Sequence, residues 1–310
     1  MTRQILAVLL ATALGGWGRA WAGAGAQPLG FLSLDANARA VGMGGAYTAL
    51  ATDVNALLYN PAGLGRVSRH EATFMHNQAY QGIVQDYLAF ASRQGWGANF
   101  NYLDFGGVPK TTISNPDGVG LERAGLNDLA LSAGYGRVVF EALSAGAAFK
   151  FIQESIADVS AQGYAVDFGL LYDVERFKGL SLGGAVQNAG PAMRFQKSSE
   201  NLPLTIRGGA AYQAPLRGQK CAFALDIIKE RGESAAVAFG AEVLAARRFP
   251  IRIGYSSRND SGIGLAFGAG YRHESFDIDY AFAPYGALGD AHRISATLRW
   301  GKTILPRAKD

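Results

Sequence analysis

The sequence contains little of what marks most metalloenzymes and disulfide-bonded secreted domains. Its single cysteine, Cys221, excludes an intrachain disulfide. Charged residues make up 17% of the chain, below the about 25% that is typical of soluble domains. The four histidines are separated and lack the spacing of metal ligands: His70, His76, His273 and His292. These shortages argue against a disulfide scaffold and a metal site, and against an ordinary soluble surface.

The sequence also lacks a hydrophobic run long enough for a transmembrane helix. The run from Ile5 to Leu14 is ten residues long, whereas a spanning helix needs about 20. It follows the basic Arg3 and precedes Ala20-Trp21-Ala22, an arrangement typical of a signal peptide with its cleavage site. We therefore predict that residues 1–22 are a signal peptide. Without a spanning helix, only a β-barrel could place this chain in a membrane.

Positive charge is too scarce to predict a nucleic-acid partner. The net charge of +4 falls to +2 once Arg3 and Arg19 leave with the signal peptide, because 27 basic residues then face 25 acidic ones. No basic stripe remains, so no nucleic acid is expected to bind.

The motifs do not indicate an enzyme or a nucleotide cofactor. Gly42, Gly44 and Gly45 resemble a nucleotide loop, but that fingerprint needs a preceding strand, a third glycine at fixed spacing and an acidic residue about 20 positions further on. None of these is present, so we interpret the glycines as sites of close backbone packing. No nucleophile elbow is evident, because the one stretch with Gly-x-Ser-x-Gly spacing, Gly179–Gly183, runs into the predicted strand 180–188 and not from a strand into a helix. The prediction is a non-enzymatic protein without a cofactor or a metal.

The most frequent pattern in the sequence is an alternation of large apolar residues with small or charged ones. Large apolar residues recur at every second position with Gly, Ala, Ser or a charge between them, which indicates two-faced β-strands. The 41 glycines among 310 residues are nearly twice the usual share of about 7%, and many occupy the small face. The fourteen predicted strands lie near 69–79, 83–93, 96–103, 127–138, 143–154, 163–173, 180–188, 204–213, 219–228, 234–245, 249–257, 261–272, 275–283 and 291–301.

The chemistry of the two faces predicts which one meets lipid. A soluble β-sandwich, the alternative fold, would bury its large apolar face and cover the outside with charge. Here the other face is mostly Gly, Ala and Ser with isolated charges, which is a poor surface for water. The long links, Asp104–Leu126, Ala189–Pro203 and Pro284–Asp290, all follow odd-numbered strands and so emerge at one end. We predict an all-β transmembrane antiparallel barrel whose large apolar face points outwards.

The segment between the signal peptide and the first strand differs from the rest. Residues 23–68 are rich in Ala and Gly and predict one or two short helices, which Pro61 ends. The segment is too small to have a core of its own, and a lumen lined by small residues has room for it. We therefore predict a helical plug inside the barrel, with Gly42, Gly44, Gly45, Asn60 and Pro61 as its hypothetical gate residues.

Charged residues on the small face are predicted to line the lumen. Asp277 and Asp279 share a face and could be read as paired catalytic carboxylates. Ala281 and Ala283 continue that face, so we favour lumen-lining charges that pair with Arg252 or Arg272 on neighbouring strands. The barrel is predicted to span residues 69–301, and residues 302–310 to form a short periplasmic tail.

Three sequence segments resemble a known family. Two are the N-terminal runs Ala38-Arg39-Ala40-Val41-Gly42-Met43-Gly44-Gly45-Ala46-Tyr47-Thr48-Ala49-Leu50 and Leu58-Tyr59-Asn60-Pro61-Ala62-Gly63-Leu64. The third is the C-terminal run Asp279-Tyr280-Ala281-Phe282-Ala283-Pro284-Tyr285-Gly286. Together they resemble the PorV/PorQ family, and the Gly-Gly-Ala and Asn-Pro-Ala pieces are also similar to the FadL family. The resemblance implies a FadL-like barrel of about 14 strands with an N-terminal hatch, in the outer membrane of a diderm bacterium.

The resemblance leaves three functions open. A PorV/PorQ-type protein would be an accessory of protein export, as in type IX secretion, or escort cargo at the outer membrane. A FadL-like protein would take up hydrophobic small molecules, and a structural or adhesive barrel would do neither. The expected partners are outer-membrane lipid and, according to the function, secretion-system components, secreted proteins or a hydrophobic ligand.

Overall fold

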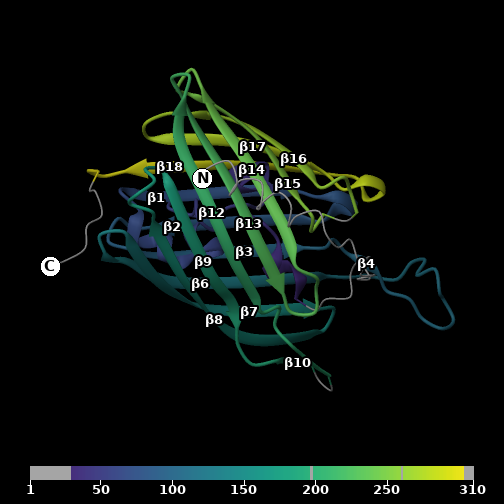
Figure 1. Ribbon diagram of the computed structural model, residues 1–310. Helices are drawn as coiled ribbons and strands as arrows, with labels where there is room; N and C mark the ends of the chain where they lie inside the picture. Colours follow the sequence, from purple (N-terminus) through teal and green to yellow (C-terminus); the bar gives the residue numbers. More distant parts are fainter. Residues whose placement is uncertain (1–28, 196–197, 260, 304–310) are drawn as a thin grey trace.

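The computed structural model describes residues 29–195, 198–259 and 261–303, and these form a closed antiparallel β-barrel (Figure 1). The predicted signal peptide and most of the predicted tail lie outside the described residues. Fourteen strands run around the barrel in chain order, and β1 closes the ring against β18. The strands are β1 (His70–Gln78), β2 (Val84–Ala91), β3 (Trp96–Asp104), β6 (Leu126–Phe140), β7 (Leu143–Ile156), β8 (Val159–Asp173), β9 (Leu180–Ala189), β12 (Thr205–Leu216), β13 (Gln219–Glu230), β14 (Ala236–Ala245), β15 (Phe249–Ser256), β16 (Leu265–Arg272), β17 (Phe276–Pro284) and β18 (Asp290–Trp300).

The remaining elements are short. The helical pieces are η2 (Gly30–Ser33), α2 (Ala38–Gly42), α3 (Ala56–Tyr59), η3 (Pro61–Arg66), η4 (Tyr80–Gly82) and η5 (Gly286–Leu288). Two small hairpins, β4 (Val108–Pro109) with β5 (Arg123–Ala124) and β10 (Met193–Phe195) with β11 (Ser198–Glu200), belong to links between barrel strands. Among the described residues, no helix has the length and apolar character to span a membrane.

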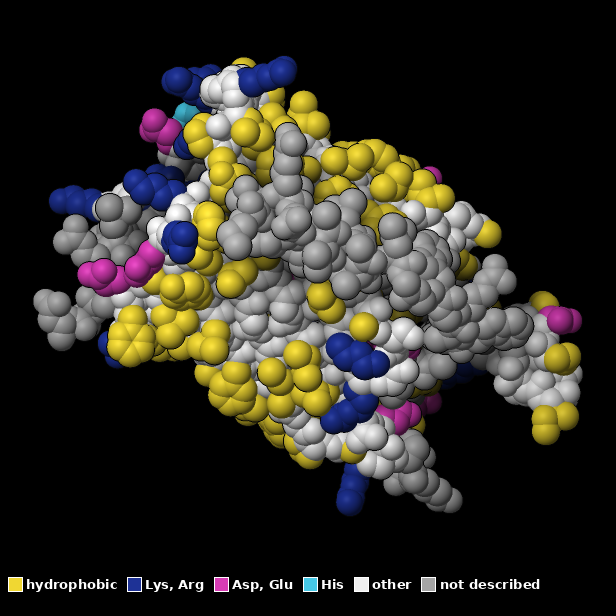
Figure 2. Space-filling view, viewed as in Figure 1, with side chains coloured by type: hydrophobic (Ala, Val, Ile, Leu, Met, Phe, Trp, Pro, Cys, Tyr) yellow, Lys and Arg dark blue, Asp and Glu magenta, His cyan; other side chains and the backbone are white. Residues whose placement is uncertain are grey.

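The large apolar face of the strands points away from the barrel axis. On β13, Leu225 and Ile227 are 50% and 56% exposed, whereas Asp226 between them is fully buried. The same alternation runs along the other strands, and hydrophobic side chains cover the flank of the barrel (Figure 2). An exterior of this kind is stable only against lipid, because exposed Leu, Ile and Phe gain nothing from water. The predicted orientation is confirmed, and the exterior of the barrel has the character of a membrane-facing surface.

The two ends of the barrel differ in their connections. One, which we call the turn end, has short links such as 141–142, 217–218 and 246–248. The other, the loop end, has longer links that include 105–125, 190–204 and 257–264. The first of these projects furthest from the barrel, where β4 is labelled in Figure 1. Since short turns of outer-membrane barrels face the periplasm, the loop end faces the outside.

Some predicted strand boundaries were wrong. The strand predicted to begin at 261 begins at Leu265, because Gly264 has a φ of +76° and breaks the extended chain. The strand predicted to begin at 163 begins at Val159, since the preceding link is only two residues long and β7 pairs with β8 up to that point. The long link after Asp104 contains the β4–β5 hairpin.

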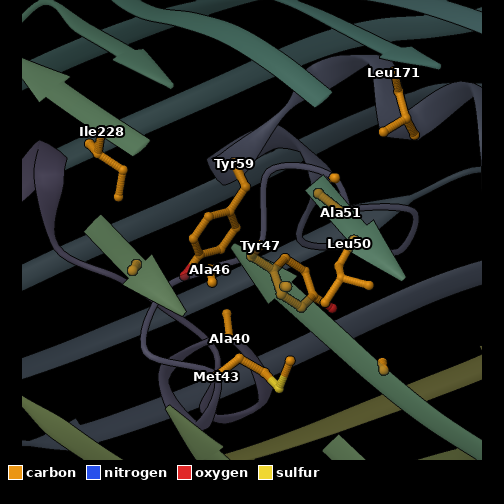
Figure 3. Packing of buried hydrophobic residues seen from close by; sticks show 14 of the residues in the cluster. Ala40, Met43, Ala46, Tyr47, Leu50, Ala51, Tyr59, Leu171 and Ile228 are labelled. Atoms are coloured by element: carbon orange, nitrogen blue, oxygen red, sulfur yellow. The ribbon is translucent and has the colours of Figure 1, made fainter. Parts of the chain in front are cut away.

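The lumen is filled by residues 29–67, which we call the plug. Plug side chains and the small face of the wall form continuous buried clusters. One of them contains Met43, Tyr47, Leu50 and Tyr59 of the plug together with Leu171 of β8 (Figure 3). The small residues of the wall leave the room that these larger plug side chains occupy, which is the physical reason for the glycine-rich inner face.

Candidate functional site

The plug meets the wall through backbone contacts that only glycine permits. A Cβ on Gly146 of β7 would lie 2.4 Å from the carbonyl of Pro61, and one on Gly169 of β8 would lie 2.0 Å from Asn60 Oδ1. Gly65 of η3 is as close to the wall, with the backbone of Arg137 at 2.6 Å from its would-be Cβ. The turn-end half of the plug is therefore pressed against β6, β7 and β8 without intervening side chains.

Asn60 connects this half of the plug to the wall through hydrogen bonds, and Pro61 begins the helix that follows. The Asn60 side chain is fully buried and donates to the carbonyls of Thr48, at 3.0 Å, and Leu170, at 2.9 Å. Its Oδ1 accepts from the Ala62 N–H at 3.2 Å and so caps η3. Pro61 takes the first helical position, where its missing N–H costs nothing. Asn60 therefore ties two parts of the plug to β8.

Replacing Asn60 with alanine is expected to lower the free energy of unfolding by about 1–3 kcal/mol, because two buried carbonyls and one N–H lose their partner. Urea unfolding in phospholipid vesicles measures the change. Pro61→Ala is the matched control, since it removes no hydrogen bond. An equal loss in both variants would contradict this role of the Asn60 amide.

The glycines of the Gly42-x-Gly44-Gly45 motif lie against the opposite side of the wall. Gly44 and Gly45 have φ of +67° and +77°, a conformation that side-chain-bearing residues rarely adopt. A Cβ on Gly44 would lie 2.6 Å from the backbone of Tyr255, and one on Gly42 would lie 3.1 Å from the Cα of Gly268. The motif thus serves close packing of α2 and the turn after it against β15 and β16.

The four predicted lumen charges lie in one ion-pair network. Arg252 pairs with Asp279 at 2.7 Å, and Arg272 lies 3.4 Å from Asp277. At its centre is Glu242 of β14, which contacts Arg252 at 2.5 Å and Arg39 of the plug at 3.0 Å. The network therefore joins the plug to the wall rather than lining an open lumen.

Glu242 and Arg39 were not among the predicted site residues. Glu242 stands directly opposite Arg252 in the register of β14 and β15. Its alternation on the small face was a signal that could have identified it. Arg39 could not be found in this way, because it belongs to a segment without strand periodicity.

A second polar anchor holds the middle of the plug. Asp226 of β13 is fully buried and accepts from the N–H groups of Tyr47 and Thr48, at 3.0 and 2.9 Å, and from Thr48 Oγ1 at 2.6 Å. Arg207 of β12 lies 3.3 Å from the same carboxylate and donates to the Gly45 carbonyl at 2.7 Å. One wall carboxylate and one wall guanidinium thus satisfy four plug groups.

Two buried phenols complete the polar interior of the plug. Burial raises the pKa of the Tyr47 and Tyr59 hydroxyls well above the usual value, so both remain protonated donors. The Tyr47 hydroxyl donates to Asp53, and the Tyr59 hydroxyl donates to the Ala36 carbonyl at 3.0 Å. Both bonds lie within the plug and stabilise its fold.

A cavity of about 490 Å³ lies at the loop end, between the plug and the wall. The plug contributes Ser33, Leu34, Asp35 and Val41, and strands β13 to β18 contribute the rest of the wall. The links 231–235 and 257–264 form its rim, and Ser234 and Ala235 there are exposed to solvent. The site is therefore a cup that faces outside, with the plug as part of its floor.

The comparisons with known proteins concern the fold. Neither the protein-family models nor the curated protein sequences give a match to this chain. Among solved structures, it is similar to the CymD monoaromatic hydrocarbon channel, with a TM-score of 0.59 and 11% identity over 86% of this chain and 97% of that one. The toluene transporter TbuX of Ralstonia pickettii has a TM-score of 0.56 and 15% identity over 87% and 98%.

A FadL homologue of Pseudomonas aeruginosa is also similar, with a TM-score of 0.50 and 12% identity over 86% of this chain and 98% of that one. With identities this low, the likeness establishes the architecture alone. The chain has the FadL-like fold, a closed barrel of fourteen strands with short helical pieces at its N-terminal side.

Proposed function

We propose that this protein admits a small solute through the outer membrane, binding it first in the loop-end cavity and releasing it when the plug shifts. The observation that carries the proposal is the cavity of about 490 Å³, which is bounded by the plug and reached from outside. Its volume lies in the range of small-molecule sites, about 300–1,000 Å³. The names of the similar structures, a monoaromatic hydrocarbon channel and a toluene transporter, support a solute with an apolar part.

The plug is the gate in this proposal. Its turn-end half stands between the cavity and the periplasm, where Arg66 pairs with Asp173 and donates to the Ala142 carbonyl at 2.8 Å. A solute passes only if part of residues 29–67 moves. The predicted gate residues Gly42, Gly44, Asn60 and Pro61 pack against the wall, and Gly45 contacts it through its carbonyl, which accepts from Arg207. A movement of the plug has to begin at such contacts.

A reversible cross-link tests the gate. Gly42 of α2 faces Gly268 of β16, with 3.1 Å between a Cβ built on the first and the Cα of the second, so cysteines at both positions are close enough for a disulfide. In the Gly42→Cys/Gly268→Cys protein we expect oxidation to reduce uptake of labelled toluene or benzoate at least tenfold, and reduction to restore it. Gly42→Cys alone and Gly268→Cys alone, each with the native Cys221 also present, are the controls. Uptake that continues through the oxidised protein would rule out plug movement as the gating step.

Export assistance of the PorV/PorQ type is the second candidate, favoured by the link 105–125. This link projects from the loop end and exposes Ile113 and Val119, which are 106% and 78% exposed (Figure 1). Exposed apolar side chains on an outward loop suit contact with another protein. A deletion strain separates the candidates when solute uptake and the secretome are measured together. Loss of secretion with normal uptake would favour export assistance; the reverse result would favour solute uptake.

A further inference from the structure

One buried arginine in the cavity wall forms no hydrogen bond or ion pair within the part of the chain that the structure describes. Arg293 of β18 is 3% exposed, lies on the lumen face of the strand and lines the cavity. Its Nε and Nη1 are buried, and no group among the described residues accepts a hydrogen bond from them. Burying an unpaired charge is costly, so a protein that retains one gains something from it.

The other buried cations do not share this property. Among the described residues, the buried lysine and arginine side chains besides Arg293 are Lys150, Arg207 and Arg252. Lys150 lies 3.1 Å from Asp167, Arg207 lies 3.3 Å from Asp226, and Arg252 lies 2.7 Å from Asp279. The wall thus supplies a carboxylate wherever a cation serves packing. Among the described residues, it supplies none that pairs with Arg293.

The remaining charges of the cavity are arranged so that Arg293 stays available. Arg258 is engaged by Glu230 at 3.3 Å and by the Ser33 carbonyl at 2.8 Å. Asp35 and Glu233 also line the cavity, and neither forms an ion pair with Arg293. An anionic ligand at Arg293 would share the cavity with these two carboxylates, which favours a ligand with only one anionic end.

Aromatic and apolar groups line the same cavity as Arg293. Tyr80 and Tyr285 line the cavity with ring centroids 5.1 Å apart and planes inclined by 53°. Val41 and Leu265 add apolar surface. Burial raises the pKa of the Tyr80 hydroxyl above its ordinary value, so this group remains a neutral donor near neutral pH. The cavity therefore offers a cation, phenolic hydroxyls and an apolar lining in one space.

We propose that the cavity selects small organic anions, with a carboxylate or phosphate paired to Arg293 and a compact apolar ring against Tyr80, Tyr285 and Val41. The inference rests on the proposed function, in which this cavity is the entry site. It restricts the solute to organic anions, which differ from the neutral hydrocarbons in the names of the similar channels. A guanidinium matches both oxyanions through paired hydrogen bonds.

The experiment compares ligands of one shape and different charge. Binding of benzoate, phenyl phosphate, nitrobenzene and inorganic phosphate to the purified full-length barrel in detergent is measured by calorimetry. We expect benzoate or phenyl phosphate to bind at least about tenfold more tightly than nitrobenzene, the neutral isostere of benzoate. The stronger of the two identifies the anionic group. Preference for nitrobenzene, or equal binding of all four ligands, would overturn the proposal.

Variants separate recognition from a structural role. Arg293→Gln should abolish the preference for the anion, Arg293→Lys should retain part of it, and Arg194→Gln, at an exposed arginine of β10, should leave it unchanged. Without ligand, Arg293→Gln should melt at the same or a higher temperature, because it removes an unpaired buried charge. A lower melting temperature together with an intact preference would show that Arg293 serves the fold. Anion binding without uptake in cells would refute the proposed transport and leave this inference standing.

Discussion

Replacing Gly254 with leucine is expected to displace the plug and to lower the stability of the barrel by about 3 kcal/mol or more. A Cβ at this position of β15 would lie 2.0 Å from the amide nitrogen of Gly44 and 2.3 Å from the carbonyl carbon of Met43. Overpacking commonly costs about 1–3 kcal/mol when side chains can yield. Here the clashing atoms belong to the plug backbone. Because Gly44 itself packs against the backbone of Tyr255, the plug cannot move away from the leucine at this position.

The measurement is the urea midpoint of the folded barrel in lipid vesicles, together with the protease sensitivity of residues 29–67. Gly208→Leu is the matched control, since Gly208 lies on the lipid face of β12 and nothing is within 4 Å of a Cβ built there. Equal stability of the two variants would show that the plug tolerates movement at α2 in the resting protein.

Replacing Asp226 with alanine is expected to loosen the plug and to open a conducting path. The change removes the acceptor for Tyr47 and Thr48 and leaves Arg207 as an unpaired buried cation. Breaking one side of a buried pair typically costs about 3–5 kcal/mol, a large part of the stability of a domain. The loss falls on the interface between plug and wall, because the strand ladder of β13 remains intact.

Single-channel recording in planar bilayers is the direct measurement, and we expect frequent openings in the Asp226→Ala protein and rare ones in the parent. Glu175→Ala, at an exposed residue of the turn-end link 174–179, is the control. The double variant Asp226→Ala/Arg207→Ala should be less unstable than Asp226→Ala alone, because no unpaired cation remains. A closed barrel with parental stability in Asp226→Ala would contradict the anchoring role of this carboxylate.

The wall of the barrel was predictable from the sequence because its two faces meet different solvents. Leu225 and Ile227 alternate with Ala224 and Asp226 along β13, and the same period of two recurs along the chain. Strand ends were less predictable. Ile263 continues the apolar alternation, yet it lies in a link, because the left-handed conformation of Gly264 interrupts the strand.

The site was predictable only where it follows that alternation. Arg252, Arg272, Asp277 and Asp279 could be placed on the lumen face, and the same alternation places Glu242 there. The plug residue Arg39, which pairs with Glu242 as both arginines do, could not be placed from the sequence. Asp226 carries no motif that distinguishes it from any other lumen carboxylate. Arg293 is even harder to identify from the sequence. It differs from the other lumen cations in having no hydrogen-bond partner within the described residues, and pairing depends on side chains far away in the sequence.

The sequence by itself determined that fourteen two-faced strands form a barrel, that its apolar face meets lipid and that a small-residue face surrounds the N-terminal segment. These properties follow from local periodicity and composition, which act over a few neighbouring residues. Only the tertiary structure decided which carboxylates hold the plug, where the cavity lies and which cation is left for a ligand. Those outcomes depend on distances between residues more than a hundred positions apart, such as Arg39 and Glu242, and closure of the barrel alone brings such residues together.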